Sequence, residues 1–114
     1  CRYLENVRKA DEYISSNLFR PPHGRMRRAQ TLELCKDRKI ILWDILTEDY
    51  DTSLSPQECW QNVRKYVSPG SIVVFHDNIK ALENQRYALE QTLKCCTMDG
   101  YVFKAIPYTN MKKA

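Results

Sequence analysis

Apolar runs and amphipathic stretches alternate along this chain, and each apolar run ends in polar residues. Stretches with apolar residues at helical spacing predict helices over Tyr3–Ser16, Met26–Asp37, Pro56–Val67 and Leu82–Met98. Runs rich in β-branched, leucine and aromatic residues predict strands over Leu18–Arg20, Lys39–Ile45, Ser71–His76 and Tyr101–Ile106. Strands that alternate with helices indicate βαβ units, parallel pairing and an α/β fold.

Two local signals fix helix ends. Ser55 precedes Pro56 and stands three residues before Glu58, which is a capping box with proline at the first helical position. Gly100 follows the last predicted helix, where a left-handed residue commonly ends a helix. The two central strands are apolar on both faces, which predicts a sheet covered on both sides.

Composition narrows the class of protein. The 114 residues are 43% hydrophobic and 28% charged, as in an ordinary globular protein, and they predict a single segment over residues 1–114. No apolar run approaches the ~20 residues that span a membrane. The net charge of +4 is mild, and its densest cluster lies at Arg20–Arg28, without a nucleic-acid-binding motif. An anionic or polyhydroxylated ligand is favoured over nucleic acid.

Five cysteines form an odd set without a Cys-x-x-Cys pair, which predicts neither a complete disulfide framework nor a zinc ribbon. Four of them, Cys35, Cys59, Cys95 and Cys96, fall within predicted helices. Free buried thiols are expected, and they favour a reducing compartment such as the cytoplasm. A location in the cell envelope stays open for a longer protein.

His76 and Asp77 lie where the Ser71–His76 strand ends. Ligands of α/β proteins bind outside the carboxyl ends of strands, so this pair is a candidate site. An imidazole oriented by a neighbouring carboxylate is suited to general acid catalysis. The alternative is structural, with Asp77 starting a turn and His76 covering the core.

Other strand ends offer further polar groups. Arg20 precedes two prolines, which stiffen a loop that could direct the His23 backbone N–H at a ligand. Asp44, Asp49 and Asp51 lie at or after the end of the Lys39–Ile45 strand, where one of these carboxylates is available to pair with Arg20 across neighbouring strand ends. Trp43 and Tyr50 could stack on sugar faces, although packing in the core is the better explanation for Trp43.

Three segments, taken in order, resemble the last three motifs of the polysaccharide deacetylases, carbohydrate esterase family four: Phe19–Gly24, Leu42–Tyr50 and Pro69–Asp77. The resemblance covers nearly the whole chain. It implies a parallel-stranded partial (β/α) barrel, the C-terminal half of a distorted (β/α)7-8 barrel. It also implies metal-dependent hydrolysis of N-acetyl groups on a carbohydrate, with zinc as the expected ion in the complete enzyme.

The resemblance assigns roles to matching residues. Arg20 matches the arginine that positions the catalytic aspartate, Asp49 the acidic residue that holds this arginine, and the His23 backbone amide the oxyanion donor. His76 matches the histidine that protonates the leaving amine. Two more positions line the substrate site: Tyr50 matches the groove tryptophan and Val74 the leucine of the acetyl pocket.

The chain departs from the family pattern in several places. His23 replaces the usual tyrosine, Tyr50 replaces tryptophan, and Leu46 stands where many members have an aspartate. The Thr-Phe-Asp-Asp-Gly and His-x-x-x-His motifs, which hold the metal and the base, have no counterpart here, so no metal ligand is predicted in this chain.

These departures lead to two hypotheses. The first is the C-terminal part of a deacetylase, inactive alone, that associates with the missing N-terminal half or with itself through an exposed strand edge and apolar face. The second is a non-catalytic carbohydrate-binding or interaction module derived from the same fold. An unrelated nucleotide-binding domain is disfavoured, since the chain has only three glycines and no glycine-rich phosphate loop.

Overall fold

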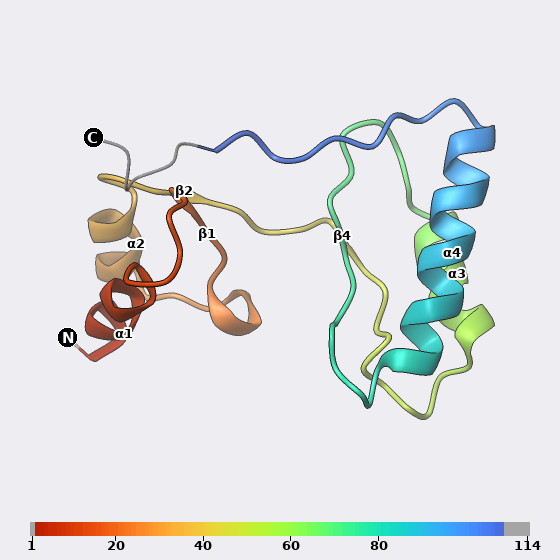
Figure 1. Ribbon diagram of the computed structural model, residues 1–114, viewed down its shortest axis with the longest axis horizontal. Helices are drawn as coiled ribbons and strands as arrows, with labels where there is room; N and C mark the ends of the chain where they lie inside the picture. Colours follow the sequence, from red (N-terminus) through yellow and green to blue (C-terminus); the bar gives the residue numbers. More distant parts are fainter. Residues whose placement is uncertain (1, 109–114) are drawn as a thin grey trace. The chain divides into compact units, whose positions relative to one another are not determined.

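The computed structural model describes residues 2–108, which gather into two compact units (Figure 1). Within the described range, unit 1 comprises residues 2–42 and 105–108, and unit 2 comprises Trp43–Lys104. Each is described by itself. The prediction that residues 1–114 are one segment of a larger catalytic domain stays a prediction. Within the described range 2–108, no helix is both long and apolar enough to cross a membrane.

Unit 1 contains two helices, a short 3-10 turn and two paired strands. In chain order these are α1 (Arg2–Ala10), β1 (Leu18–Phe19), η1 (Pro22–Gly24), α2 (Arg28–Leu34) and β2 (Lys39–Ile40). The strands β1 and β2 pair in parallel, with Leu18 opposite Lys39. Parallel pairing of these two segments was predicted and is confirmed.

Helix α1 ends earlier than the sequence predicts, at Ala10 rather than Ser16. After Ala10 the backbone N–H groups of Asp11, Glu12 and Tyr13 donate to carbonyls three residues back, which tightens the turn and ends the helix. Asp11 is then placed to accept two bonds from Arg38, at 2.9 and 2.5 Å. The Arg38 side chain is only 4% exposed, so this ion pair is part of the interior of unit 1.

Unit 2 contains β3 (Ile45–Leu46), α3 (Pro56–Arg64), β4 (Val73–Val74) and α4 (Leu82–Met98). The strands pair in parallel with Ile45 opposite Val73 and Leu46 opposite Val74. Ser55 caps α3 as predicted, accepting from the Glu58 backbone N–H at 3.1 Å, and α4 has the predicted bounds.

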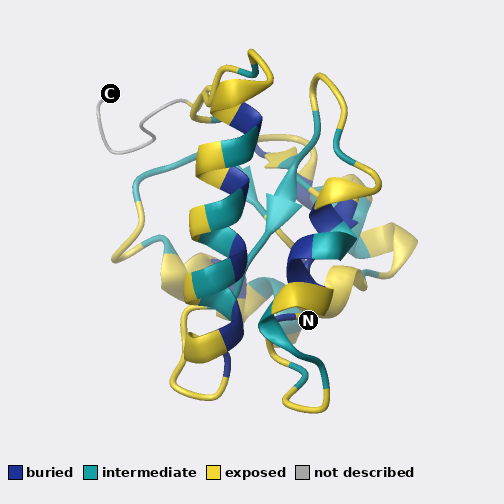
Figure 2. Ribbon diagram, turned by 90° about the vertical axis from the view of Figure 1, so that its right-hand side faces the viewer, coloured by how far each residue is buried: buried dark blue, intermediate teal, exposed yellow. Residues whose placement is uncertain are grey.

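The core of unit 2 lies between the helices and the β3–β4 pair. Its buried apolar members are Ile45, Cys59, Trp60, Val63 and Ala88. On α4 the buried residues recur every fourth position, so one side of the helix faces the interior and the other faces solvent (Figure 2). This buried side includes two polar residues, Asn84 and Thr92.

The continuous strand predicted over Lys39–Ile45 is wrong. The segment pairs first with β1, through the bond from Ile41 N to Phe19 O at 2.8 Å, and then with β4, through Asp44 N to Ile72 O at 3.2 Å. The described residues thus form two separate two-stranded parallel sheets. An α/β arrangement with parallel strands is confirmed, whereas the partial barrel is not. Neither sheet is fully covered, since Lys39 of β2 is exposed and Val73 and Val74 of β4 are half-buried.

Two further predictions are corrected. Tyr101–Ile106 is not a strand: Tyr101 N–H continues the end of α4 by donating to Cys96 O, and Val102 and Phe103 are exposed. A strand requires a partner backbone, and among the described residues the sheets pair only β1 with β2 and β3 with β4. Cys35 is free as predicted but exposed, because it follows the last residue of α2 instead of lying on its buried face. Cys1 lies outside the described residues.

Candidate functional site

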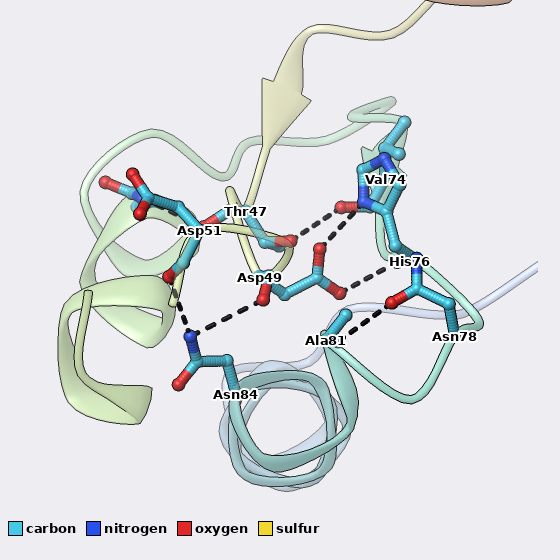
Figure 3. A network of polar contacts seen from close by, with 9 residues as sticks. Thr47, Asp49, Asp51, Val74, His76, Asn78, Ala81 and Asn84 are labelled. Atoms are coloured by element: carbon cyan, nitrogen blue, oxygen red, sulfur yellow. Dashed lines mark hydrogen bonds and ion pairs between the residues drawn. The ribbon is translucent and has the colours of Figure 1, made fainter. Parts of the chain in front are cut away.

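The candidate site of unit 2 forms where the chain leaves β3 and β4. Since Leu46 lies opposite Val74, Asp49 and His76 emerge from adjacent strand ends and meet (Figure 3). The Asp49 side chain is fully buried, whereas 35% of the His76 side chain is exposed. The site therefore has one concealed carboxylate and one imidazole that solvent can reach.

Asp49 contacts His76 at two points. One carboxylate oxygen accepts from the His76 backbone N–H at 2.8 Å, and the other lies 2.8 Å from ring Nδ1. An ionised carboxylate only accepts hydrogen bonds, so Nδ1 holds the proton of this contact. The ring is thereby oriented with Nε2 as the nitrogen that can exchange a proton with a ligand.

Tyr50 packs against the same imidazole. The two ring centroids lie 5.0 Å apart at an interplanar angle of 75°, an edge-to-face arrangement. Tyr50 is also 37% exposed, so part of its ring remains accessible. It therefore restrains His76 and presents an aromatic surface beside it.

The turn that brings Asp49 inward has a left-handed residue, Glu48, at φ 60°. Residues other than glycine and asparagine rarely adopt this conformation, because their Cβ then crowds the backbone. Buried Thr47 stabilises the turn by donating through Oγ1 to Val74 O at 2.8 Å, and Asn62 on α3 donates to Thr47 O at 3.0 Å. Contacts to both neighbouring elements thus hold the strand end in place.

Sequence reasoning placed the wrong carboxylate beside His76. Asp77 is exposed, and the partner of the ring is Asp49, which lies 27 positions away in the chain. The assignment of Asp49 to Arg20 joins residues of two units and stays a prediction. Val74 is half-buried in β4 and Trp43 is half-buried at the start of unit 2, and their roles toward substrate likewise stay predictions.

The remaining predicted groups lie in unit 1. Arg20 donates through Nε to Ile41 O at 3.3 Å and through Nη2 to Leu42 O at 3.5 Å. His23 lies in η1 with left-handed φ 56°, and Gly24 follows with φ 68°. The loop after the prolines thus has an unusual backbone, as predicted, but the left-handed conformation begins at His23. Its proposed oxyanion role stays a prediction.

Burial and nearby carboxylates also raise the pKa of a thiol in the core of unit 2, that of Cys59. Burial first, and the charge of Asp49 second, raise the pKa of fully buried Cys59 to about 11. Cys59 is therefore an unreactive core residue at neutral pH.

The Asp51 carboxyl lies on the same turn as Asp49. Hydrogen bonds from the Ser53 hydroxyl and backbone N–H lower the pKa of this carboxyl.

The described residues do not fit a metal ion. Between residues 2 and 108, no three His, Cys, Asp or Glu side chains are grouped closely enough to bind one. Both oxygens of Asp49 already contact His76. The chemistry assigned to this chain below therefore uses only its own protonatable and hydrogen-bonding groups.

Comparison with known proteins shows the fold. No family model and no curated protein matches the sequence. Among solved structures, a peptidoglycan N-acetylglucosamine deacetylase in complex with a naphthalenyl N-oxidanyl-benzamide superposes with a TM-score of 0.83 at 21% identity. The match covers 93% of this chain and 53% of that chain.

A second match is a family 4 carbohydrate esterase from Streptomyces lividans in complex with acetate. Its TM-score is 0.51 at 23% identity, over 68% of this chain and 41% of that one. This chain thus spans about half the length of the first solved structure it matches. It has the fold of part of a polysaccharide deacetylase, as the three sequence motifs predicted.

Proposed function

We propose that this chain supplies the acid group of a metal-dependent deacetylase that hydrolyses N-acetyl groups on a polysaccharide or N-acetylated sugar. The observation that supports this most directly is the two-point contact between Asp49 and His76. A buried carboxylate that holds one ring nitrogen leaves the other in a fixed direction at a solvent-accessible strand end. The likeness to part of a deacetylase fold supports the same reaction class.

In the proposed reaction, water adds to the acetamide carbonyl and the C–N bond breaks. The nitrogen leaves as an amine and needs a proton, which His76 donates from Nε2. Asp49 orients the ring for this transfer, because its carboxylate contacts Nδ1 at 2.8 Å and leaves Nε2 as the nitrogen that donates. The carbonyl oxygen becomes negatively charged before the bond breaks, and the His23 backbone N–H is the proposed donor to it.

A divalent ion, zinc by the family resemblance, would activate the water and polarise the carbonyl when bound. Its ligands would come from a further part of a longer protein, since residues 2–108 group too few candidate ligands to bind it. Arg20 is proposed to position the base that accompanies that ion. Trp43, Tyr50 and Val74 are proposed to contact the sugar and its acetyl group.

The test compares this chain with a longer one that includes the rest of the deacetylase fold. We expect the longer chain to release free amine and acetate from N-acetylglucosamine oligomers, and His76→Ala to lower kcat by about 10²- to 10⁴-fold, the usual contribution of a general acid. Asp77→Asn is the matched control, since it changes an exposed neighbour. Full activity of His76→Ala would refute the assigned role.

A second candidate function is carbohydrate binding without hydrolysis. Tyr50 favours it, because its ring lies beside His76 and is 37% exposed, and aromatic rings can pack against sugars. It predicts that N-acetylglucosamine oligomers shift the NMR signals of Tyr50 and His76 in this chain alone. Tyr50→Ala should abolish those shifts, whereas an inactive longer chain with intact binding would favour this function over the first.

We also propose that the strands are covered by a further part of a longer protein or by a second copy. Leu42 is 50% exposed at the end of the β1–β2 segment, and β4 is half-buried, so apolar area remains in water. Sedimentation of this chain with and without the remaining part of the fold separates the two partners. A monomer that does not bind that part would refute the proposal.

A further inference from the structure

Asn84, the third residue of α4, contacts the backbone of Asp49 through its side chain. Asn84 is 6% exposed, although asparagine is a weak helix former and is seldom buried. A buried amide costs free energy unless it is hydrogen-bonded, so its contacts explain why it is there.

The Asn84 amide nitrogen is directed at three backbone carbonyls of one turn. Nδ2 lies 3.4 Å from Asp49 O, 3.2 Å from Asp51 O and 3.2 Å from Leu54 O. Figure 3 shows the side chain extending from α4 toward this turn. All three partners are acceptors, so only the NH2 end of the amide can face them. One side chain thereby ties the whole Asp49–Leu54 turn to α4.

Asp49 is consequently fixed from opposite sides. Its carbonyl faces Asn84, and its carboxylate faces the ring and backbone of His76. Tyr50, the next residue, packs on the same ring. A shift of the turn would move the carboxylate and the tyrosine together, because both belong to the segment that Asn84 holds.

We propose that Asn84 is a positioning residue for His76, acting through Asp49 and the turn that follows it. This inference deepens the proposed function and rests on it for the catalytic consequence. Its structural content is independent of activity: Asn84 keeps the proton of the His76 ring on Nδ1 by keeping Asp49 in contact with it.

The decisive experiment is NMR of the imidazole nitrogens in this chain. The sequence has only two histidines, so the His76 ring is assigned by loss of its signals in His76→Gln. In the unaltered chain we expect a single Nδ1–H tautomer with a slowly exchanging Nδ1 proton. Asn84→Leu, similar in size but without the donor, should show a mixture of both tautomers and lose the protected proton.

The matched control is Thr92→Val. Thr92 is 4% exposed on the same side of α4, and its hydroxyl donates within the helix, to Ala88 O at 2.7 Å. The Thr92→Val substitution removes one buried polar group without altering the contacts of the Asp49 turn, so the ring signals of His76 should stay as in the unaltered chain. Equal disturbance by Asn84→Leu and Thr92→Val, or none by Asn84→Leu, would overturn the proposal.

Two additional measurements keep the result decisive. If Asn84→Leu does not fold, Asn84→Ser retains a small donor, and the ring signals should then show partial loss of the Nδ1–H tautomer. In an active longer chain, Asn84→Leu should lower kcat by up to about 100-fold and change KM far less, since it disturbs the geometry of the acid. A longer chain without activity would contradict the proposed function alone, and the tautomer measurement would still decide the role of Asn84.

Discussion

Replacing Asp49 with asparagine keeps the size of the side chain and removes the charge that His76 contacts. The backbone N–H of His76 can only donate, so the single amide oxygen of the variant must remain its partner. The amide nitrogen then faces ring Nδ1 and donates to it. The ring proton has to move to Nε2, and the imidazole is held in the opposite tautomer from that in the structure.

The expected magnitude follows from these two contacts. A hydrogen bond to a charged group contributes about 1.5–3 kcal/mol and a neutral one about 0.5–1.5 kcal/mol. Loss of charge at both contacts would remove about 2 kcal/mol, and the variant no longer has to bury a charge, so we expect the free energy of unfolding to fall by about 1–2 kcal/mol. The equivalent exchange in a Ser-His-Asp triad lowers kcat about 10⁴-fold by fixing the wrong tautomer.

The assay is ¹⁵N NMR of the ring at about pH 8, where an ordinary imidazole is neutral, together with urea unfolding. Asp77→Asn makes the same atomic exchange at an exposed carboxylate next to the histidine and should change neither result. Retention of the Nδ1–H tautomer in Asp49→Asn would refute the reasoning. So would an equal loss of stability in the two variants, because burial of Asp49 would then make no difference.

Three other predictions concern stability and reactivity. Asp11→Asn removes the charge that faces buried Arg38 and should lower the free energy of unfolding by about 1–3 kcal/mol, measured with urea. Cys59 should resist iodoacetamide at about pH 8, while exposed Cys35 reacts. Because the pKa of Cys59 rises from 9.0 to about 11 on folding, its contribution to the free energy of unfolding is fully present below pH 9 and should decline as the pH rises toward 11. Urea midpoints measured across that pH window would show the decline. Glu48→Gly should leave the free energy of unfolding unchanged or raise it by up to ~1 kcal/mol, because glycine adopts φ 60° without strain; a clear decrease in a thermal melt would contradict this.

Features determined by neighbouring residues were predictable from the sequence. The Ser55 cap and the bounds of α4 depend on short-range hydrogen bonds and on Gly100, which has the left-handed φ of 90° expected after a helix. Parallel pairing follows from the alternation of strands and helices. Asp49 and His76, which the sequence places after two successive strands, do lie together, whereas their roles stay predictions.

The partner of His76 was not predictable in the same way. Adjacent Asp77 is nearer in sequence, whereas Asp49 reaches the ring only through the register of β3 against β4 and the left-handed turn at Glu48. The prediction of one continuous strand over residues 39–45 was wrong for a related reason. The apolar content of a segment does not determine which neighbouring strand it pairs with, and this segment pairs first with β1 and then with β4. For Asn84 a signal existed: a polar, weakly helical residue at a buried position of α4.

Asp49 bonds to the backbone of residue 76 as well as to its ring. Substitutions at positions 49 and 76 should therefore differ in their effects on the fold and on the proposed chemistry. That bond uses the N–H common to every residue except proline, so it persists when the imidazole is replaced. Position 76 should then tolerate many residues when variants are selected for protein abundance, and position 49 very few. A library of the longer chain, scored once for abundance and once for the proposed hydrolysis, should then rank the two positions differently, with substitutions at His76 removing the proposed activity while the fold is kept.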